Sequence, residues 1–323
     1  MMTMGSVAPV LAALDTERMS ERLRRLIGED AIVTRAELVE EAKPRRAVVR
    51  YRVKGAPARE IFGKVHPDAE HATRAFCTMK LLAQEVFSSC EGLRVTRPVG
   101  LLPELAMVLY WPADGVPLDR LPPERAVPWV RATAHWLALL HGSRVRLDRR
   151  FDLHNETTNL REWAALVGRA LPRDAAGADS LAGRIGALSA ELQLETDVPI
   201  HKDFHYQHVI VGDGLTVIDQ DEALLGDPTL DVAHFCANLR LLSLRAQTTD
   251  AGAARLSDAF LKEYARLTGW QADIRFTFFF AYTCLKMAKQ LATGRGPRPI
   301  PSGAERARQA LTVLEEGLAC LGS

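Results

Sequence analysis

The sequence has few cysteines, almost no net charge and no long apolar run. Its five cysteines are an odd number and none are close neighbours, which favours reduced thiols over disulfides or a cysteine-based zinc site. The 41 basic residues nearly balance 40 acidic ones, which argues against a protein that coats nucleic acid. The most apolar segment, 276–285, is too short to cross a bilayer, which needs about 20 residues. We therefore expect neither a nucleic-acid partner nor a membrane span.

The N-terminus also lacks the features of a secretion signal, because no basic segment followed by an apolar core is present there. We expect a cytoplasmic protein, and the sequence says nothing of its oligomeric state. Its 323 residues are 47% apolar and 25% charged, which is typical of a globular protein with about two domains.

The first 111 residues combine strand-like and helical patterns. A short amphipathic helix is predicted at 15–27, closed by Gly28. A longer one follows Asp68, with Ala72, Phe76 and Met79 at helical spacing. The strand-like segments lie at 31–39, 46–54, 59–65, 93–101 and 105–110. We predict a small antiparallel sheet with one long helix inserted after its third strand.

From residue 112 onward the pattern is mainly helical. Pro128 is predicted to open the first helix of this part. Further helices are predicted at 159–171, 179–194, 229–246, 251–268, 275–291 and 304–321. Two short strands, 209–211 and 215–218, are joined by a Gly-Asp-Gly turn. The fold class is therefore α+β, with an N-terminal lobe at 1–111 and a C-terminal lobe at 112–323.

Chemically capable side chains concentrate in three segments, 201–208, 219–221 and 226–231. One interpretation is phosphoryl transfer, in which the Asp203 carboxylate accepts a hydroxyl proton and Asp219 holds Mg²⁺.

Two other interpretations remain open on the residues alone. His201, His205 and His208 have the i, i+4, i+7 spacing of a zinc site, although no Glu follows His201 as in zinc peptidases. The other interpretation is that these segments are polar loops without a catalytic role, whose aspartates cap helices and pair with arginines.

Three motifs in order, His201-x-Asp203-x-His205, Ile218-Asp219 and Gly226-Asp227-Pro228-x-x-Asp231, resemble those of the aminoglycoside phosphotransferase and choline kinase family. The resemblance covers about residues 20–300. It implies a bilobal protein-kinase-like fold and a kinase that phosphorylates a hydroxyl of a small molecule, such as an antibiotic, amino alcohol or sugar. It also implies ATP, with GTP as the alternative nucleotide, and Mg²⁺.

The resemblance assigns roles residue by residue. Asp203 would be the general base or hydroxyl-orienting group, and Asp219 the principal Mg²⁺ ligand. Lys64, at the end of the third strand, would contact the α- and β-phosphates. The Trp111 carbonyl and the Ala113 N–H would pair with the adenine edge. His201, Asp227 and Asp231 would be structural.

Two positions depart from the family pattern. His208 stands where the family has an Asn that binds Mg²⁺, and an imidazole is a poor Mg²⁺ ligand. Asp221 is the better substitute for that contact. Ala75 stands where the family has the glutamate that pairs with the strand lysine, which leaves Lys64 without its usual partner.

These two departures support a rival hypothesis, a nucleotide-binding pseudokinase that acts as a scaffold or regulator. For the kinase, we expect the acceptor site between the catalytic loop and the C-terminal helices, within 235–300, with aromatic residues from 276–282. The near-neutral chain does not favour a polycationic acceptor.

Overall fold

The computed structural model describes residues 8–43, 46–245, 247–294 and 302–322. The chain forms two compact units, and each is described here by itself. The first is Met1–Gly115 together with Gly212–Glu222, and the second is Val116–Val211 together with Ala223–Ser323. The first unit therefore contains Asp219 and Asp221, whereas Asp203 belongs to the second.

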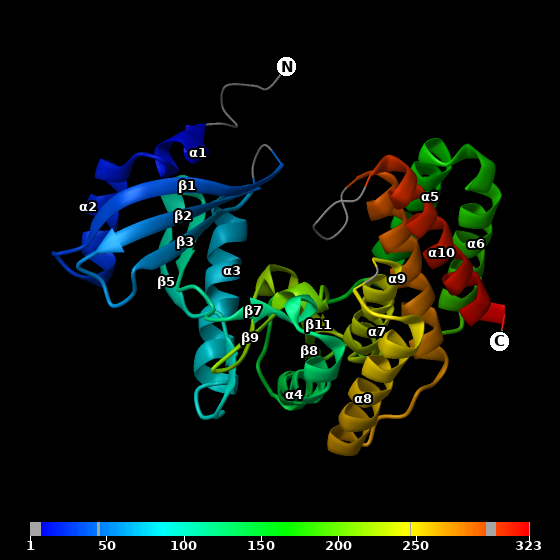
Figure 1. Cartoon of the computed structure of the whole chain (residues 1–323). Helices are drawn as coiled ribbons and strands as arrows, with labels where there is room; N and C mark the ends of the chain where they lie inside the picture. The colour runs from blue at the N-terminus through cyan, green and yellow to red at the C-terminus, as the bar shows by residue number, and fades with distance from the viewer. Residues whose placement is uncertain (1–7, 44–45, 246, 295–301, 323) are drawn as a thin grey trace. The chain divides into compact units, whose positions relative to one another are not determined.

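The first unit is built on an antiparallel sheet with the strand order β1-β2-β3-β6-β5 (Figure 1). Its elements are α1 (Ala8–Ala13), α2 (Thr16–Ile27), β1 (Ile32–Lys43), β2 (Arg46–Lys54), β3 (Glu60–Val65), α3 (Ala69–Leu81), β4 (Leu93–Val95), β5 (Pro98–Leu102), β6 (Met107–Tyr110) and β10 (Gly214–Val217). Strand β10 pairs in parallel with β4. The predicted antiparallel sheet with one long helix is confirmed, but the single strand predicted at 93–101 is wrong: the structure has β4 and β5 there, and only β5 belongs to this sheet.

Strand β3 sets the direction of Lys64. Ile61 and Val65 are buried in the core that α1 and α2 form with the sheet. Because side chains alternate along a strand, Lys64 points to the opposite face. Gly63 lies on the core side, where a Cβ would come within 2.7 Å of the Met107 sulfur. The glycine thus lets the strand pack closely beside the lysine.

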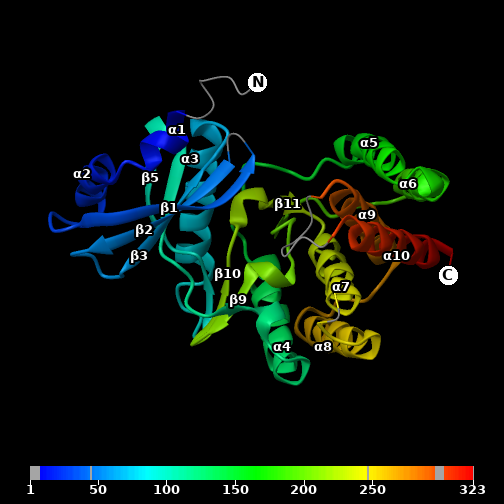
Figure 2. The ribbon, with the colours of Figure 1, turned by 45° about the horizontal axis from the view of Figure 1, so that its top comes forward.

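The second unit is mainly helical. Its elements are β7 (Val116–Pro117), α4 (Pro123–Gly142), α5 (Leu153–Ala170), α6 (Ala175–Ser189), β8 (Val198–Ile200), β9 (Val209–Gly212, whose last residue clusters with the first unit), β11 (Leu224–Gly226), α7 (Thr229–Leu244), α8 (Asp250–Thr268), α9 (Ile274–Ala292) and α10 (Gly303–Gly322). Helix α9 packs against α5, α6, α7 and α10, and Figure 2 shows it among them. Within the described ranges, no helix has the length and apolar character needed to span a membrane.

Helix α4 differs from the prediction because it begins at Pro123, not at Pro128. A proline fits the first helical turn, where its missing N–H needs no partner. The Arg125 and Ala126 N–H groups donate to the Pro122 carbonyl, at 2.9 and 3.1 Å. Pro128 lies inside the helix, where it cannot donate to the carbonyl four residues earlier. The helix is long enough to accommodate this local loss.

Candidate active site

In the first unit, one lysine is held by two aspartates. Lys64 Nζ lies 2.7 Å from Asp219 Oδ1 and 2.7 Å from Asp221 Oδ2. Burial would lower the pKa of Lys64, but the two carboxylates outweigh it and raise that pKa well above its usual value. The lysine is therefore a permanent cation, and the two carboxylates converge on it.

The backbone that follows β10 turns sharply to present both carboxylates. Asp219 has a left-handed φ of 65°, which is uncommon for a residue other than glycine. The Gln220 side-chain amide donates to the Val217 carbonyl at 2.6 Å and closes the turn. Strained backbone of this kind concentrates at functional sites.

Helix α3 supplies none of the partners of Lys64 that the structure shows. Ala75 is buried in the helix, and Glu70 pairs instead with Arg74 at 2.7 Å on the exposed side. The sequence left Lys64 without an orienting partner, and the structure supplies two from segment 219–221. Lys64 is thus oriented by two carboxylates of the same unit, and its role toward nucleotide phosphates stays a prediction.

The predicted adenine contacts lie directly after β6. The Trp111 N–H donates to the Arg97 carbonyl at 3.0 Å, which fixes the backbone there. Among the described residues, the Trp111 carbonyl and the Ala113 N–H have no hydrogen-bond partner. Both residues are half-buried. The two groups are therefore available for a planar base, and their pairing with adenine stays a prediction.

In the second unit, Asp231 holds the loop that carries Asp203. The loop follows β8, and Asp231 lies in the first turn of α7. Its carboxylate accepts the backbone N–H groups of His201 and Lys202, at 2.6 and 2.7 Å, and contacts His141 Nε2 at 3.2 Å. These bonds explain why Lys202 can keep a left-handed φ of 68°.

Asp203 is surrounded by cations and imidazoles. Lys286 Nζ lies 2.8 Å and His234 Nε2 3.4 Å from Asp203 Oδ1, whereas His205 Nε2 lies 4.0 Å from Oδ2. Burial would raise the pKa of Asp203, but Lys286, followed by the two histidines, holds it well below its usual value. Asp203 is therefore ionised at neutral pH, and its side chain keeps 34% of its surface exposed.

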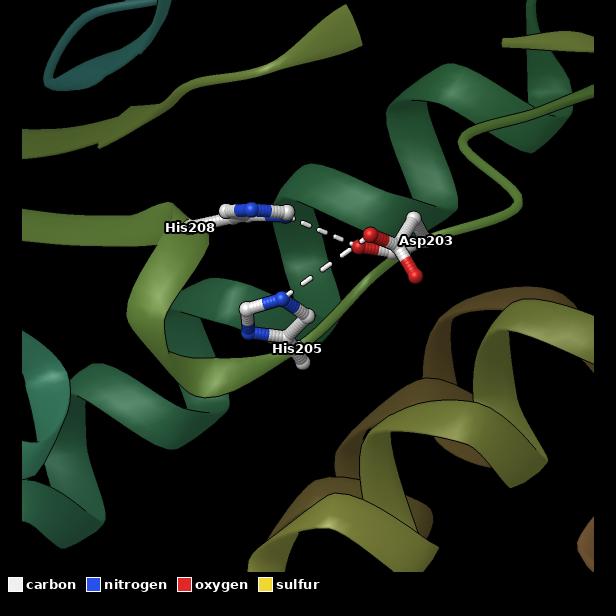
Figure 3. A group of neighbouring side chains, drawn as sticks. All are labelled: Asp203, His205 and His208. Atoms are coloured by element: carbon white, nitrogen blue, oxygen red, sulfur yellow. Dashed lines mark hydrogen bonds and ion pairs between the residues drawn. The ribbon is translucent and has the colours of Figure 1, made fainter. Parts of the chain in front are cut away.

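Asp203, His205 and His208 form a cluster whose ligand atoms lie within 4.8 Å of one another (Figure 3). The His208 Nδ1–H donates to the Asp203 carbonyl oxygen at 2.9 Å, and His205 Nδ1 accepts the Gln207 N–H at 3.2 Å. Burial, followed by the nearby His208, lowers the pKa of His205 well below its usual value, so its ring is neutral. Its one proton is then on Nε2, which faces the Asp203 carboxylate.

This hydrogen bonding does not fit zinc. A zinc ion would need the lone pair of His205 Nε2, which carries the ring proton because Nδ1 accepts the Gln207 N–H. His201, the third histidine of the zinc hypothesis, is instead buried with its ring against Trp136 and Phe204. The hard carboxylate oxygens of Asp219 and Asp221 suit Mg²⁺ better than any imidazole.

Sequence reasoning missed Lys286 and the contacts around Glu156. Lys202 Nζ lies 2.9 Å from Glu156 Oε1, and the Tyr282 hydroxyl donates to Glu156 Oε2 at 2.5 Å. Burial would raise the pKa of Glu156, but Lys202 and these hydrogen bonds lower it. Tyr282 and Lys286 lie one turn apart on α9, on a helix whose other side is apolar. That spacing was the available signal.

The structure describes most of the range 235–300 in which the acceptor site is predicted. Phe278 and Phe279 are buried in the helical core. Tyr282, also largely buried, lies beside Glu156, and its ring contacts that of Trp163 in a tilted arrangement, with centroids 5.2 Å apart. The parts of that range at 246 and 295–300 lie outside the described residues.

Comparison with solved structures supports the fold. Choline kinase from Cryptosporidium parvum Iowa II gives a TM-score of 0.62 at 13% identity and covers 95% of each chain. A thermostable mutant of aminoglycoside phosphotransferase APH(4)-Ia gives 0.60 at 15%, covering 88% of this chain and 96% of its own. Amicoumacin kinase hAmiN, in complex with AMP-PNP, Ca²⁺ and Ami, gives 0.60 at 14%, covering 96% of each.

No curated protein matches the sequence. The model of the phosphotransferase enzyme family matches residues 28–272, which is well over half of the chain. That range contains both the Lys64–Asp219–Asp221 group and the Asp203 loop. The protein-kinase-like fold expected from the motifs is therefore confirmed, and the chain belongs to the phosphotransferase enzyme family.

Proposed function

We propose that the protein transfers the γ-phosphoryl group of ATP to a hydroxyl of a small molecule. The observation that carries the proposal is the state of Asp203. Lys286 and His234 hold its Oδ1, and among the described residues no group lies within hydrogen-bond distance of Oδ2. An ionised oxygen that is fixed in place and accessible is what orienting an acceptor hydroxyl requires.

In this reaction the acceptor oxygen bonds to the γ-phosphorus and the bond to the β-phosphate oxygen breaks, so ADP leaves. The hydroxyl proton passes to Asp203 Oδ2 and then to solvent. Because its pKa is low, Asp203 is a weak base, and it acts mainly by orienting the hydroxyl and accepting the proton late.

The first unit would bind the nucleotide. Lys64 would contact the phosphates as a point charge, and Trp111 and Ala113 would pair with adenine. Asp219 and Asp221 would hold Mg²⁺. His208 belongs to the second unit, and its role as a metal ligand stays a prediction. The metal would neutralise charge on the phosphates. The AMP-PNP and Ca²⁺ bound to hAmiN support a nucleotide with a divalent cation.

The test combines thermal-shift titration with ATP, with and without Mg²⁺, and measurement of ADP formation. We expect stabilisation that depends on Mg²⁺ and slow ATP hydrolysis that is lost in Asp203→Ala. The matched control is Asp197→Ala, an exposed aspartate of the same unit that should keep full turnover.

The metal assignment is tested with Asp219→Asn, which should lose the Mg²⁺-dependent part of the stabilisation. Asp213→Asn, an exposed aspartate six residues earlier, is its control. Nucleotide binding without turnover across a broad acceptor panel would contradict the kinase and favour the scaffold.

A further inference from the structure

Lysines are scarce in this chain, and several of them surround the Asp203 loop. Only eight of the 41 basic residues are lysines. In the second unit, Lys202 pairs with Glu156, Lys286 pairs with Asp203, and Lys289 follows Lys286 on α9. We call these five residues the lysine face. It comes from α5, α9 and the Asp203 loop.

The first carboxylate of this face is neutralised by its own neighbours. Glu156 is ion-paired with Lys202 at 2.9 Å and accepts the Tyr282 hydroxyl at 2.5 Å. Both oxygens of Glu156 are therefore engaged by the protein. The ion pair is largely shielded from solvent, with 23% of the Lys202 and 13% of the Glu156 side chain exposed.

The second carboxylate is neutralised in the same way. Lys286 pairs with Asp203 at 2.8 Å, one helical turn beyond Tyr282 on α9. Lys289 follows and places its ammonium over the Trp163 ring, 4.5 Å from the centroid. The aromatic surface that could hold a substrate cation already holds a lysine.

We propose that the acceptor is an uncharged or anionic hydroxyl compound and not a polycation. This inference rests on the proposed kinase function. A polycationic acceptor would meet two carboxylates whose charge is already balanced by Lys202 and Lys286, and these lysines compete with its ammonium groups as intramolecular groups at high effective concentration.

The test measures binding of kanamycin, a polycation, by isothermal titration calorimetry at low ionic strength. The proteins are the wild type, the double variant Lys202→Met/Lys286→Met and a control, Lys262→Met. Lys262 is 82% exposed on α8, near Asp258, so its variant loses a lysine charge away from the face. Circular dichroism and urea unfolding establish that each variant is folded, and the two single variants replace the double one if it is not.

We expect kanamycin to bind the variants that free a carboxylate at least about tenfold more tightly than it binds the wild type or Lys262→Met. Wild-type binding that matches the variant overturns the inference, and so does a folded variant that still fails to bind. Kinase turnover is not needed for this readout. Absence of Asp203-dependent turnover with every acceptor would instead contradict the proposed function.

Discussion

Replacing Asp231 by alanine tests whether this buried carboxylate holds the Asp203 loop. The side chain is completely buried and accepts two backbone N–H groups, from His201 and Lys202, at 2.6 and 2.7 Å. Hydrogen bonds to a charged group contribute about 1.5–3 kcal/mol each. We therefore expect the free energy of unfolding to fall by about 3–6 kcal/mol, a large share of the about 5–15 kcal/mol typical of proteins.

The assay is urea-induced unfolding followed by circular dichroism and fluorescence, with the free energy extrapolated to water. Asp231→Asn retains one acceptor oxygen, so its loss should be intermediate. Asp250→Ala removes an exposed aspartate from the first turn of α8 and should cost no more than about 1 kcal/mol. A loss below about 1 kcal/mol in Asp231→Ala would refute the reasoning, because the loop would then not depend on this carboxylate.

Three further predictions concern charge. Lys286→Met should raise the pKa of Asp203, because burial would no longer be offset, so the acidic limb of the turnover–pH profile should move to higher pH. Lys286→Arg should leave the acidic limb of the profile where it is in the wild type. If the limb does not move in Lys286→Met, Lys286 does not lower the pKa of Asp203. Lys64→Met should lower turnover by about 100-fold and increase thermal stabilisation by MgCl₂ alone, because it frees two carboxylates. If MgCl₂ stabilises that variant no more than the wild type, the three-residue arrangement is wrong. Burial lowers the pKa of His205 and His234, so only the unfolded chain takes up their protons below about pH 6.5, and stability should fall as pH drops through that value. Equal melting temperatures at pH 7.5 and 5.5 would show that these rings are not buried in neutral form.

The order of the longer helices and strands could be predicted because it depends on local sequence, whereas α1, β8 and β11 were missed. Asp68, for example, accepts the His71 N–H at 2.9 Å where the predicted helix begins. The predicted start of α4 was wrong because Pro123 and Pro128 both suit the first turn of a helix. Only the hydrogen bonds to the Pro122 carbonyl distinguish them.

Only the site residues that belong to a recognisable motif could be predicted from the sequence. The resemblance located Lys64, Asp203 and Asp219, and the contact of Lys64 with Asp219 joins residues 155 positions apart. Lys286 contacts Asp203 across 83 positions and lies within the largely apolar helix α9. Its spacing from Tyr282 was a local signal, but it did not identify Asp203 as the partner. Contacts of this kind depend on how α9 packs against the loop.

The left-handed backbone at Lys202 means that replacing this residue by glycine would have two separate effects. A glycine would adopt its φ of 68° without the steric cost of about 1 kcal/mol that a side chain incurs. It would also have no ammonium to set against Glu156. The backbone conformation therefore favours glycine at position 202, whereas the proposed selectivity for the acceptor requires lysine there. Replacing Lys202 by glycine would relieve the backbone strain and would also leave the Glu156 carboxylate without its lysine, so that an amine of a ligand could pair with it.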